Sequence, residues 1–396
     1  MDGYAVRSNE TASASEQTPV LLKVQGTIAA GDSPGAIFTE LKVDNKRRAI
    51  DPNLCVEIMT GAIFPEYFDA CVKVEDTTLV EGPTGKHILV KKPVGHNANR
   101  RFAGSDMLEG DVIVKRGEIV RSSHILPLAS IGLESVPVLQ KPRVGIWSTG
   151  AEMLNGNGAT RDANGPYLMA AAKEMRLQVD FLGVLQDDPA TIQHHLQNSA
   201  ESGAYDVLIT SGAVSKGRFD HIRGVLDKMG AEIVFHGLAI RPGHPVLFAM
   251  LPGAQRRTAF FGLPGNPGAA AACFRSLTVP YLRELQGQPV ERPLLARLVR
   301  QPDTHTAKHT CHPTQTQTID CFRHGVLSTS VTGHLVVEPS ADQSPAKLGP
   351  FIAANCWIHF RPDHGGTLPR PGGGQMVECY PLSPTGAISL SPTLLN

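Results

Sequence analysis

From about Pro142 to Gly287, short apolar runs alternate with longer amphipathic segments, and this alternation constrains the fold more than any other feature of the chain. The runs RVGIWS, VDFLGV, DVLIT, VLFAML and TAFFGL have the length of strands, and helix-length segments separate most of them. Asp188 before Pro189 marks a helix start, because an acidic side chain caps the first turn and proline fits the first helical position. The pattern predicts a doubly wound, mostly parallel sheet that is covered by helices on both faces.

Loops of small and polar residues follow three of these predicted strands. In open α/β sheets, ligands bind outside the carboxyl ends of the strands. Small residues let the backbone approach a ligand, and the third loop leads directly into a helix, whose N-terminus attracts anions. A fourth loop adds Arg241 and His244. The alternative is that all of these are merely tight turns. We predict an oxyanion-binding site formed by Ser148, Thr149, Gly150, Ser211, Gly212, Ser215, Arg241, His244, Pro264, Gly265 and Asn266.

Four carboxylates lie beside the same loops, at Glu152, Asp187, Asp188 and Asp220. Mg²⁺ prefers one or two carboxylates together with substrate phosphates and water. The sequence therefore predicts a magnesium site near Asp187, Asp188 and Asp220. For Asp188 and Asp220 the alternative is a helix cap.

The regions on either side of the α/β segment have different patterns. Residues 1–100 are predicted to be β-rich, with short runs between glycine and proline residues. Residues 101–141 contain a predicted hairpin (GDVIVKRGEIV), a short helix (SSHILPLASIG) and a strand (ESVPVLQ), and they complete the N-terminal domains. The α/β domain then covers residues 142–288, and residues 289–396 form a small β C-terminal domain. The predicted fold class is an α/β multidomain chain.

Charge and cysteine content exclude several classes of protein. The chain has 37 basic and 37 acidic residues, so no global field favours nucleic acid or an anionic membrane. Its seven cysteines are scattered without a CxxC pair, which is typical of a reducing compartment. A histidine- and cysteine-containing stretch from His305 to His324 fits no zinc pattern. No targeting signal or apolar run of membrane-spanning length is visible, so a cytoplasmic location is expected.

The loops, in this order, resemble the MoeA and gephyrin E-domain family, the molybdopterin molybdenumtransferases. Together the matching segments extend over about residues 1–290, and the C-terminal part matches loosely. The segments are DGYAVR (2–7), TGA (60–62) with Asp69 and Glu75, GSD (104–106), GD (110–111), STGAE (148–152), DAN (162–164), DDP (187–189), residues 211–220, PGHP (242–245) and LPGNP (263–267).

The resemblance implies a MogA-like central domain and an elongated homodimer whose active site lies between subunits. The family's reaction inserts molybdate into the dithiolene of adenylylated molybdopterin, with Mg²⁺-dependent loss of AMP. By resemblance, Asp2, Thr60 and Asp106 approach this site from the partner subunit, and Glu152 lines it. A molybdopterin adenylyltransferase is a candidate partner. The adenylyltransferase reaction itself is disfavoured for this chain, because the Gly-Gly-Thr-Gly loop is absent.

The chain also departs from the family pattern. About fifty N-terminal residues of the family precede the DGYAVR motif, so an N-terminal truncation is expected. Ala213 replaces a glycine, Gly237 and His244 replace lysines, and Gly268-Ala269 replaces a Val-Ser pair. These losses weaken the anion site and leave a second hypothesis open, an inactive paralogue or gephyrin-like scaffold that keeps the fold and the dimer.

Overall fold

The computed structural model describes residues 2–35, 52–150, 161–186, 188–214, 221–299, 319–362, 375–386, 388 and 390. The chain divides into two compact units, Met1–Val112 and Ile113–Asn396.

The first unit is built on a six-stranded sheet with the order β4-β1-β3-β2-β6-β5. The short strand β1 (Gly3–Val6) is completely buried and pairs antiparallel with both β3 (Leu54–Ile58) and β4 (Ala70–Lys73), so the DGYAVR segment forms an inner strand. The other elements are β2 (Val20–Ile28), β5 (Thr77–Gly82), β6 (Gly85–Val90) and two 3₁₀ helices (Ser8–Thr11 and Val74–Asp76).

The second unit contains a six-stranded α/β sheet with the order β10-β12-β13-β9-β7-β8. Its last four strands run parallel, whereas β10 and β12 pair antiparallel at one edge. The strands are β7 (Arg143–Thr149), β8 (Gln178–Leu185), β9 (Val207–Ser211), β10 (Glu232–His236), β12 (Leu247–Leu251) and β13 (Thr258–Leu263). The helices are α2 (Ser122–Ser130), α4 (Asn164–Glu174), α5 (Pro189–Glu201), α6 (Ile222–Lys228), α7 (Pro267–Cys273) and α8 (Val279–Leu285), with a π-helical turn at Phe274–Thr278.

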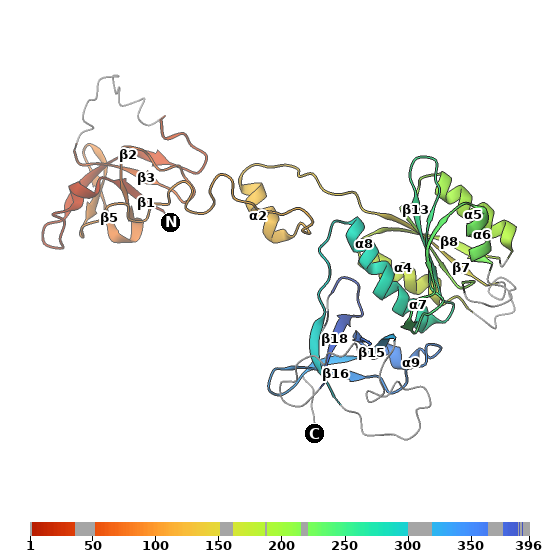
Figure 1. Ribbon diagram of the computed structural model, residues 1–396. Coiled ribbons are helices and arrows are strands. Elements are labelled where there is room, and N and C mark those ends of the chain that lie inside the picture. The colour runs from red at the N-terminus through yellow and green to blue at the C-terminus, as the bar shows by residue number, and fades with distance from the viewer. Residues whose placement is uncertain are drawn as a thin grey trace. The chain divides into compact units, whose positions relative to one another are not determined.

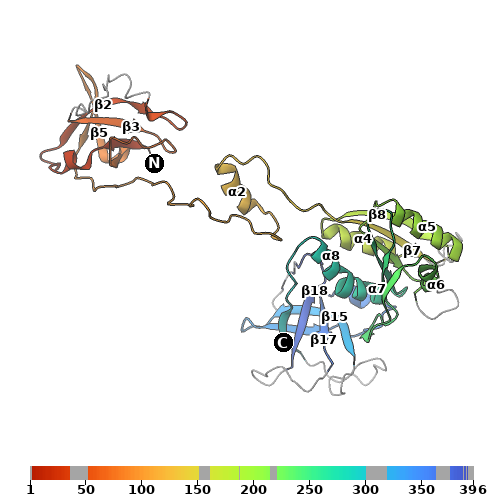
Figure 2. The same cartoon turned by 45° about the horizontal axis from the view of Figure 1, so that its top comes forward.

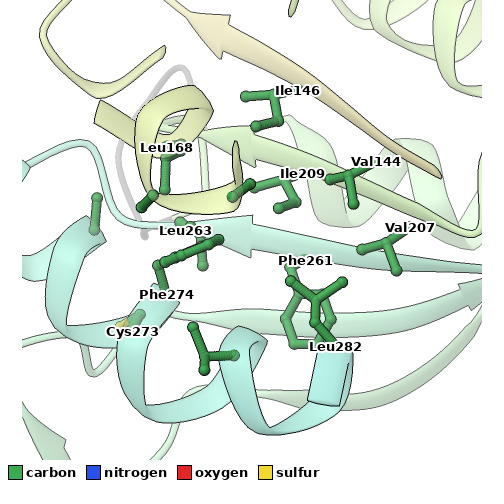
Figure 3. Close-up of a cluster of buried hydrophobic side chains, with 14 of the residues drawn as sticks. Val144, Ile146, Leu168, Val207, Ile209, Phe261, Leu263, Cys273, Phe274 and Leu282 are labelled. Atoms are coloured by element: carbon green, nitrogen blue, oxygen red, sulfur yellow. The ribbon is translucent and has the colours of Figure 1, made fainter. Parts of the chain in front are cut away.

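Helices cover both faces of this sheet (Figure 1). On one face, α4, the π-helical turn after α7, and α8 bury Leu168, Phe274 and Leu282 against Ile209 and Phe261 (Figure 3). On the other face, α5 and α6 bury a separate cluster that includes Ile192, Leu196 and Ile222. Burying an aliphatic or aromatic side chain contributes about 1.5–3 kcal/mol, so these two layers hold the sheet in place.

A small barrel follows α8 and lies next to α7 and α8 (Figures 1 and 2). The order β11-β15-β16-β14-β18-β17 closes on itself through a further pairing of β15 with β17. The barrel elements are β11 (Ile240–Arg241), β14 (Leu294–Leu298), β15 (Asp320–Thr329), β16 (Leu335–Pro339), β17 (Cys356–Phe360), β18 (Met376–Pro381) and the short helix α9 (Gly349–Ile352).

The structure confirms the predicted fold class: a central, mostly parallel sheet, a β-rich N-terminal region and a small β C-terminal domain. Two local predictions are wrong. Neither GDVIVKRGEIV nor ESVPVLQ forms a strand, and the apolar residues Val112, Ile119 and Val138 in them are exposed. The alternation of apolar and polar residues did not produce strands there, because a strand also needs a neighbouring strand with which its backbone N–H and C=O groups can form hydrogen bonds.

The six cysteines in the described part of the chain are all buried. In the same part of the chain, no helix has the length and apolar character that crossing a membrane requires.

Candidate active site

Three predicted loops leave the sheet at one edge. The parallel registers place Ser148, the next-to-last residue of β7, beside Ser211, and Ser211 beside Leu263, which are the last residues of β9 and β13. The carboxyl ends of these strands are therefore level, and the loops that follow them emerge together.

A buried hydrogen bond joins the first loop to the second. The Thr149 hydroxyl donates to the Ser211 carbonyl oxygen at 2.8 Å, and both residues are buried. Gly212 follows with a φ of +97°, and a Cβ there would lie 2.5 Å from Thr149 Oγ1. The Gly212 N–H donates to the Leu263 carbonyl oxygen at 2.8 Å, which ties the third strand to the same point. Gly212 is needed for both its backbone conformation and its lack of a side chain.

The third loop lies against the second and against α4. A Cβ on Gly265 would lie 3.6 Å from the Gly212 Cα, and the Asn164 side-chain amide donates to the Gly265 carbonyl oxygen at 2.8 Å. Pro264 is buried, whereas Gly265 and Asn266 are exposed at the start of α7. The structure thus brings the loops at Ser148–Gly150, Ser211–Ala213 and Pro264–Asn266 together.

Sequence reasoning assigned no role to Asp162, which positions the first loop. Asp162 accepts hydrogen bonds from the buried Ser148 hydroxyl at 2.7 Å and from the Gly165 N–H at 2.9 Å. A Cβ on Gly165 would lie 2.4 Å from Asp162 Oδ2 and 2.8 Å from Ser148 Oγ. The available signal was an aspartate three residues before a glycine at the start of a predicted helix, which is a capping pattern.

Ala213 adopts a left-handed backbone conformation with a φ of +55°. By resemblance, this position is a glycine in the related family, and a residue with a Cβ in this region costs about 1–2 kcal/mol. The second loop therefore keeps its conformation at a cost in stability.

The fourth loop packs against α7. Gly243 has a φ of +111°, and a Cβ there would overlap Cys273 Sγ. His244 is exposed, and its Nδ1 lies 2.7 Å from the Leu238 carbonyl oxygen, so that nitrogen is the donor. A Cβ added at Gly237 would lie 3.7 Å from His244 Cε1, so the His244 ring lies beside the place where a side chain at position 237 would begin. Arg241 is exposed at the end of β11.

Of the predicted magnesium ligands, only Asp188 is among the described residues. It caps α5, since its Oδ2 accepts from the Thr191 N–H and hydroxyl, both at 2.8 Å. These bonds hold the pKa of Asp188 below its usual value, so the carboxylate is charged. Glu152, Asp187, Ser215 and Asp220 lie outside the described residues. Among the residues that are described, no group of three or more histidine, cysteine, aspartate or glutamate side chains is arranged to hold a metal.

In the first unit, the structure brings Asp2 and Thr60 together. Asp2 Oδ1 accepts from the Thr60 N–H at 2.7 Å and from its hydroxyl at 2.9 Å, and these bonds lower the pKa of Asp2. Asp106 is exposed and pairs with the exposed Arg101 at 3.6 Å.

A cavity of about 200 Å³ adjoins the third loop, between the α/β domain and the barrel. We call it the junction cavity. Asn164, which holds Gly265, lines it, and so do His324 and Trp357 of the barrel. Sequence reasoning missed this cavity, because its walls come from segments far apart in the chain. Its lining residues are Ala163, Asn164, Tyr167, Pro242, Pro267, Gly268, Ala271, Phe322, His324, Gln343, Pro345, Lys347, Leu348, Phe351, Ile352 and Trp357.

A second cavity, of about 250 Å³, lies on the α8 side of the same junction. Its buried cation, Arg275, forms an ion pair with Glu291 at 2.6 Å and donates to the Pro381 carbonyl oxygen. Because none of the loops at the sheet edge lines this cavity, we do not assign it to the candidate site.

Comparisons with known proteins match both units. A probable molybdopterin binding domain matches residues 145–284, and a MoeA N-terminal region (domain I and II) matches residues 1–132. The molybdopterin molybdenumtransferase of Haemophilus influenzae is 31% identical over 388 residues, which are 97% of this chain and 86% of that protein. That of Synechococcus elongatus is 29% identical, over 90% of this chain and 82% of that protein. The match to that of Staphylococcus aureus strain MRSA252 is 32% identical and spans 64% of the relative's length.

Among solved structures, a molybdopterin biosynthesis MoeA protein from Pyrococcus horikoshii superimposes with a TM-score of 0.68 and 28% identity. The match covers 96% of this chain and 86% of that one. Another molybdopterin biosynthesis MoeA protein structure, from Pyrococcus horikoshii OT3, gives a TM-score of 0.66 at 23% identity and so shows the fold alone.

Proposed function

Because the chain belongs to the molybdopterin molybdenumtransferase family and is a transferase of molybdenum cofactor biosynthesis, we propose that it inserts molybdenum into adenylylated molybdopterin with Mg²⁺-dependent release of AMP. The observation that carries this proposal is the convergence of the three loops after β7, β9 and β13 at one edge of the sheet. Glycine-rich loops at such an edge let backbone N–H groups approach an oxyanion, while the Ser148 and Thr149 hydroxyls hold the loops in place through their own bonds.

Molybdate is a substrate here, and the loops would bind it. It is a tetrahedral dianion, for which small residues and oriented N–H groups are suitable partners. Gly150, Gly212 and Gly265 let the backbone approach, while Ser148 and Thr149 are held in place by the bonds to Asp162 and Ser211. We assign Arg241 and His244 to the same anion, together with Ser211, Ser215, Pro264 and Asn266.

We assign Mg²⁺ to Asp187, Asp188 and Asp220, with Glu152 lining the site. Asp188 fits this role, because its carboxylate is charged and lies between the end of β8 and the start of α5. When bound, Mg²⁺ would neutralise the pyrophosphate of the adenylylated substrate and polarise the bond that releases AMP. The contribution of the chain is to hold carboxylate oxygens after β8, beside the loops at Ser148–Gly150, Ser211–Ala213 and Pro264–Asn266, which we call the anion loops.

We further propose that the active protein is a homodimer in which Asp2, Thr60 and Asp106 of a second copy complete the site. Within the second unit, Ile125 and Leu126 of α2 are 51% and 78% exposed, and Ile131, Leu133 and Leu139 after it are also exposed. Exposed apolar side chains along one helix and the segment after it are typical of an interface. Leu126→Glu should therefore shift the protein toward monomer in analytical ultracentrifugation. A molybdopterin adenylyltransferase would be the partner that supplies the substrate.

The test is turnover with adenylylated molybdopterin, molybdate and Mg²⁺, following AMP release and molybdenum incorporation. We expect Mg²⁺-dependent AMP release coupled to incorporation, and its loss in Asp220→Asn. Asp227→Asn, on the exposed side of α6, is the matched control and should retain activity. A folded dimer that releases no AMP would contradict the proposal and favour the inactive paralogue or scaffold.

A further inference from the structure

The junction cavity has aromatic walls. Tyr167 of α4 contacts Phe351 at a ring-centroid distance of 6.1 Å, and Phe351 contacts Trp357 at 5.7 Å. His324 lies edge-on to Phe351 at 5.6 Å and to Trp357 at 5.9 Å. Aromatic walls of this kind favour a flat ring, because offset and edge-to-face contacts supply most of its binding.

One buried polar side chain in these walls, His324, has a hydrogen-bond acceptor that its neighbours do not use. His324 is 5% exposed, and its Nδ1 lies 2.9 Å from Ser340 Oγ. That hydroxyl donates to the Pro350 carbonyl oxygen at 3.3 Å, so it must accept from His324 Nδ1–H. The neutral ring then has Nε2 as an acceptor. Burial lowers the pKa of His324, which keeps the ring neutral at neutral pH.

Trp357 supplies an aromatic wall of the cavity. The side chain is 2% exposed, and its indole Nε1–H is itself buried without an acceptor in the described part of the chain. We therefore assign to Trp357 a ring contact with the ligand and no hydrogen bond.

The cavity has no excess of charge. Lys347 forms an ion pair with Asp342 at 2.6 Å, and Asn164 and Gln343 are neutral amides. A neutral, flat, polar-edged group fits these walls better than a phosphate or a molybdate.

We propose that the junction cavity binds the fused nitrogen heteroaromatic ring of the substrate, a pterin or an adenine, with His324 Nε2 accepting from the ring edge and Trp357 forming part of the aromatic wall. Such rings carry N–H donors and ring-nitrogen acceptors in one plane, between two faces that stack on aromatic side chains. Asn164 connects the cavity to the anion loops, so a ring held here would place its phosphate-bearing end toward Gly265. This inference rests on the proposed function, since it names the part of that substrate bound away from the reacting atoms.

The experiment measures ring binding by the full-length protein. Calorimetric titrations with AMP and with pterin-6-carboxylate separate the two sources of the ring. The chain has two tryptophans, so the Trp147→Phe variant reports on Trp357 alone by its fluorescence when AMP is added.

Two substitutions at His324 separate ligand binding from structure. His324→Asn keeps a donor near the Nδ1 position for Ser340 and deletes the acceptor at Nε2, whereas His324→Gln does the reverse. We expect His324→Asn to weaken binding of one of the two ligands roughly tenfold, and His324→Gln to weaken it less. His334→Asn, at an exposed barrel histidine, is the matched control and should bind as the original protein does.

Three results would overturn the inference: neither ligand binds, binding leaves Trp357 emission unchanged, or His324→Asn binds as tightly as the His334→Asn control. A parallel turnover assay distinguishes the two proposals. If His324→Asn turns over with an unchanged KM, the proposed ring site is refuted and the transferase reaction stands. If the ring ligands bind but the protein shows no turnover, the transferase reaction is refuted and the ring site stands.

Discussion

The Gly268 N–H donates to the Pro345 carbonyl oxygen at 2.8 Å, at the point where the barrel approaches the start of α7. A Cβ on Gly268 would lie 2.9 Å from Pro345 Cα and from its carbonyl oxygen. The replacement of the family's Val-Ser pair by Gly268-Ala269 therefore removes a hydroxyl and also makes room for Pro345. Glycine here admits the barrel segment that carries Gln343 and Lys347 to the wall of the junction cavity.

We predict that Gly268→Ala destabilises the protein by about 1–3 kcal/mol, the usual cost of forcing extra atoms into a packed contact. Urea unfolding measures this change. Gly349→Ala is the matched control, because nothing lies within 4 Å of its added Cβ. Equal stability of the two variants would mean that the barrel does not approach Gly268 closely in solution.

Ala213→Gly should raise the free energy of unfolding by about 1 kcal/mol, because it relieves the left-handed strain at a φ of +55°. Ala254→Gly in an exposed turn lacks this φ and should be neutral or slightly destabilising. Chemical denaturation of both variants checks the difference, and a loss of stability in Ala213→Gly would contradict the assigned conformation.

Asp188→Ser separates the cap from the metal ligand. Serine caps a helix about as well as aspartate, so stability should change by less than about 0.5 kcal/mol. If Asp188 also binds Mg²⁺, the Mg²⁺ concentration needed for half-maximal AMP release should rise at least about tenfold, the effect of about 1.4 kcal/mol in binding. An unchanged Mg²⁺ requirement would limit Asp188 to its capping role.

Asp162→Ala should cost about 0.5–2 kcal/mol by removing the capping bond to Gly165. Activity should fall further than stability, because the Ser148 hydroxyl also loses its acceptor in the anion loop. Unfolding and kcat measurements are compared with those of Asp227→Ala, an exposed aspartate on α6. Loss of stability with unchanged kcat would exclude a positioning role for Asp162.

Stability should decrease as the pH falls below about 6.5, the ordinary pKa of histidine, through His324. Burial is the main cause of its lowered pKa, and Asp342 opposes it. The unfolded chain therefore takes up a proton at a pH where the folded protein does not, so the stabilisation is complete above pH 6.5 and is lost toward the lower folded pKa. Urea unfolding from about pH 5 to about pH 8 should show a shallower slope in His324→Gln. If the original protein and His324→Gln show the same dependence of stability on pH, another group is responsible for it.

Much of the α/β domain was predictable, because its signals are local. Strand and helix periods, and the Asp188-Pro189 start of α5, depend on neighbouring residues. The inner strand β1 was quoted as a motif and not predicted as a strand, since four residues are too few to show a period. The antiparallel edge of β10 and β12 was also not predicted, because strand direction depends on how the chain returns to the sheet.

The sequence by itself determined the order of elements, the loops that could meet an anion, and the family resemblance that the comparisons confirmed. Only the tertiary structure decided that Asn164 holds Gly265, which is 101 residues away, and that His324 lies in a cavity beside α4. The physical reason is that a hydrogen bond between distant segments forms only after each has packed on its own layer. The spacing of residues along the chain therefore does not predict which distant residues this packing brings within hydrogen-bond distance.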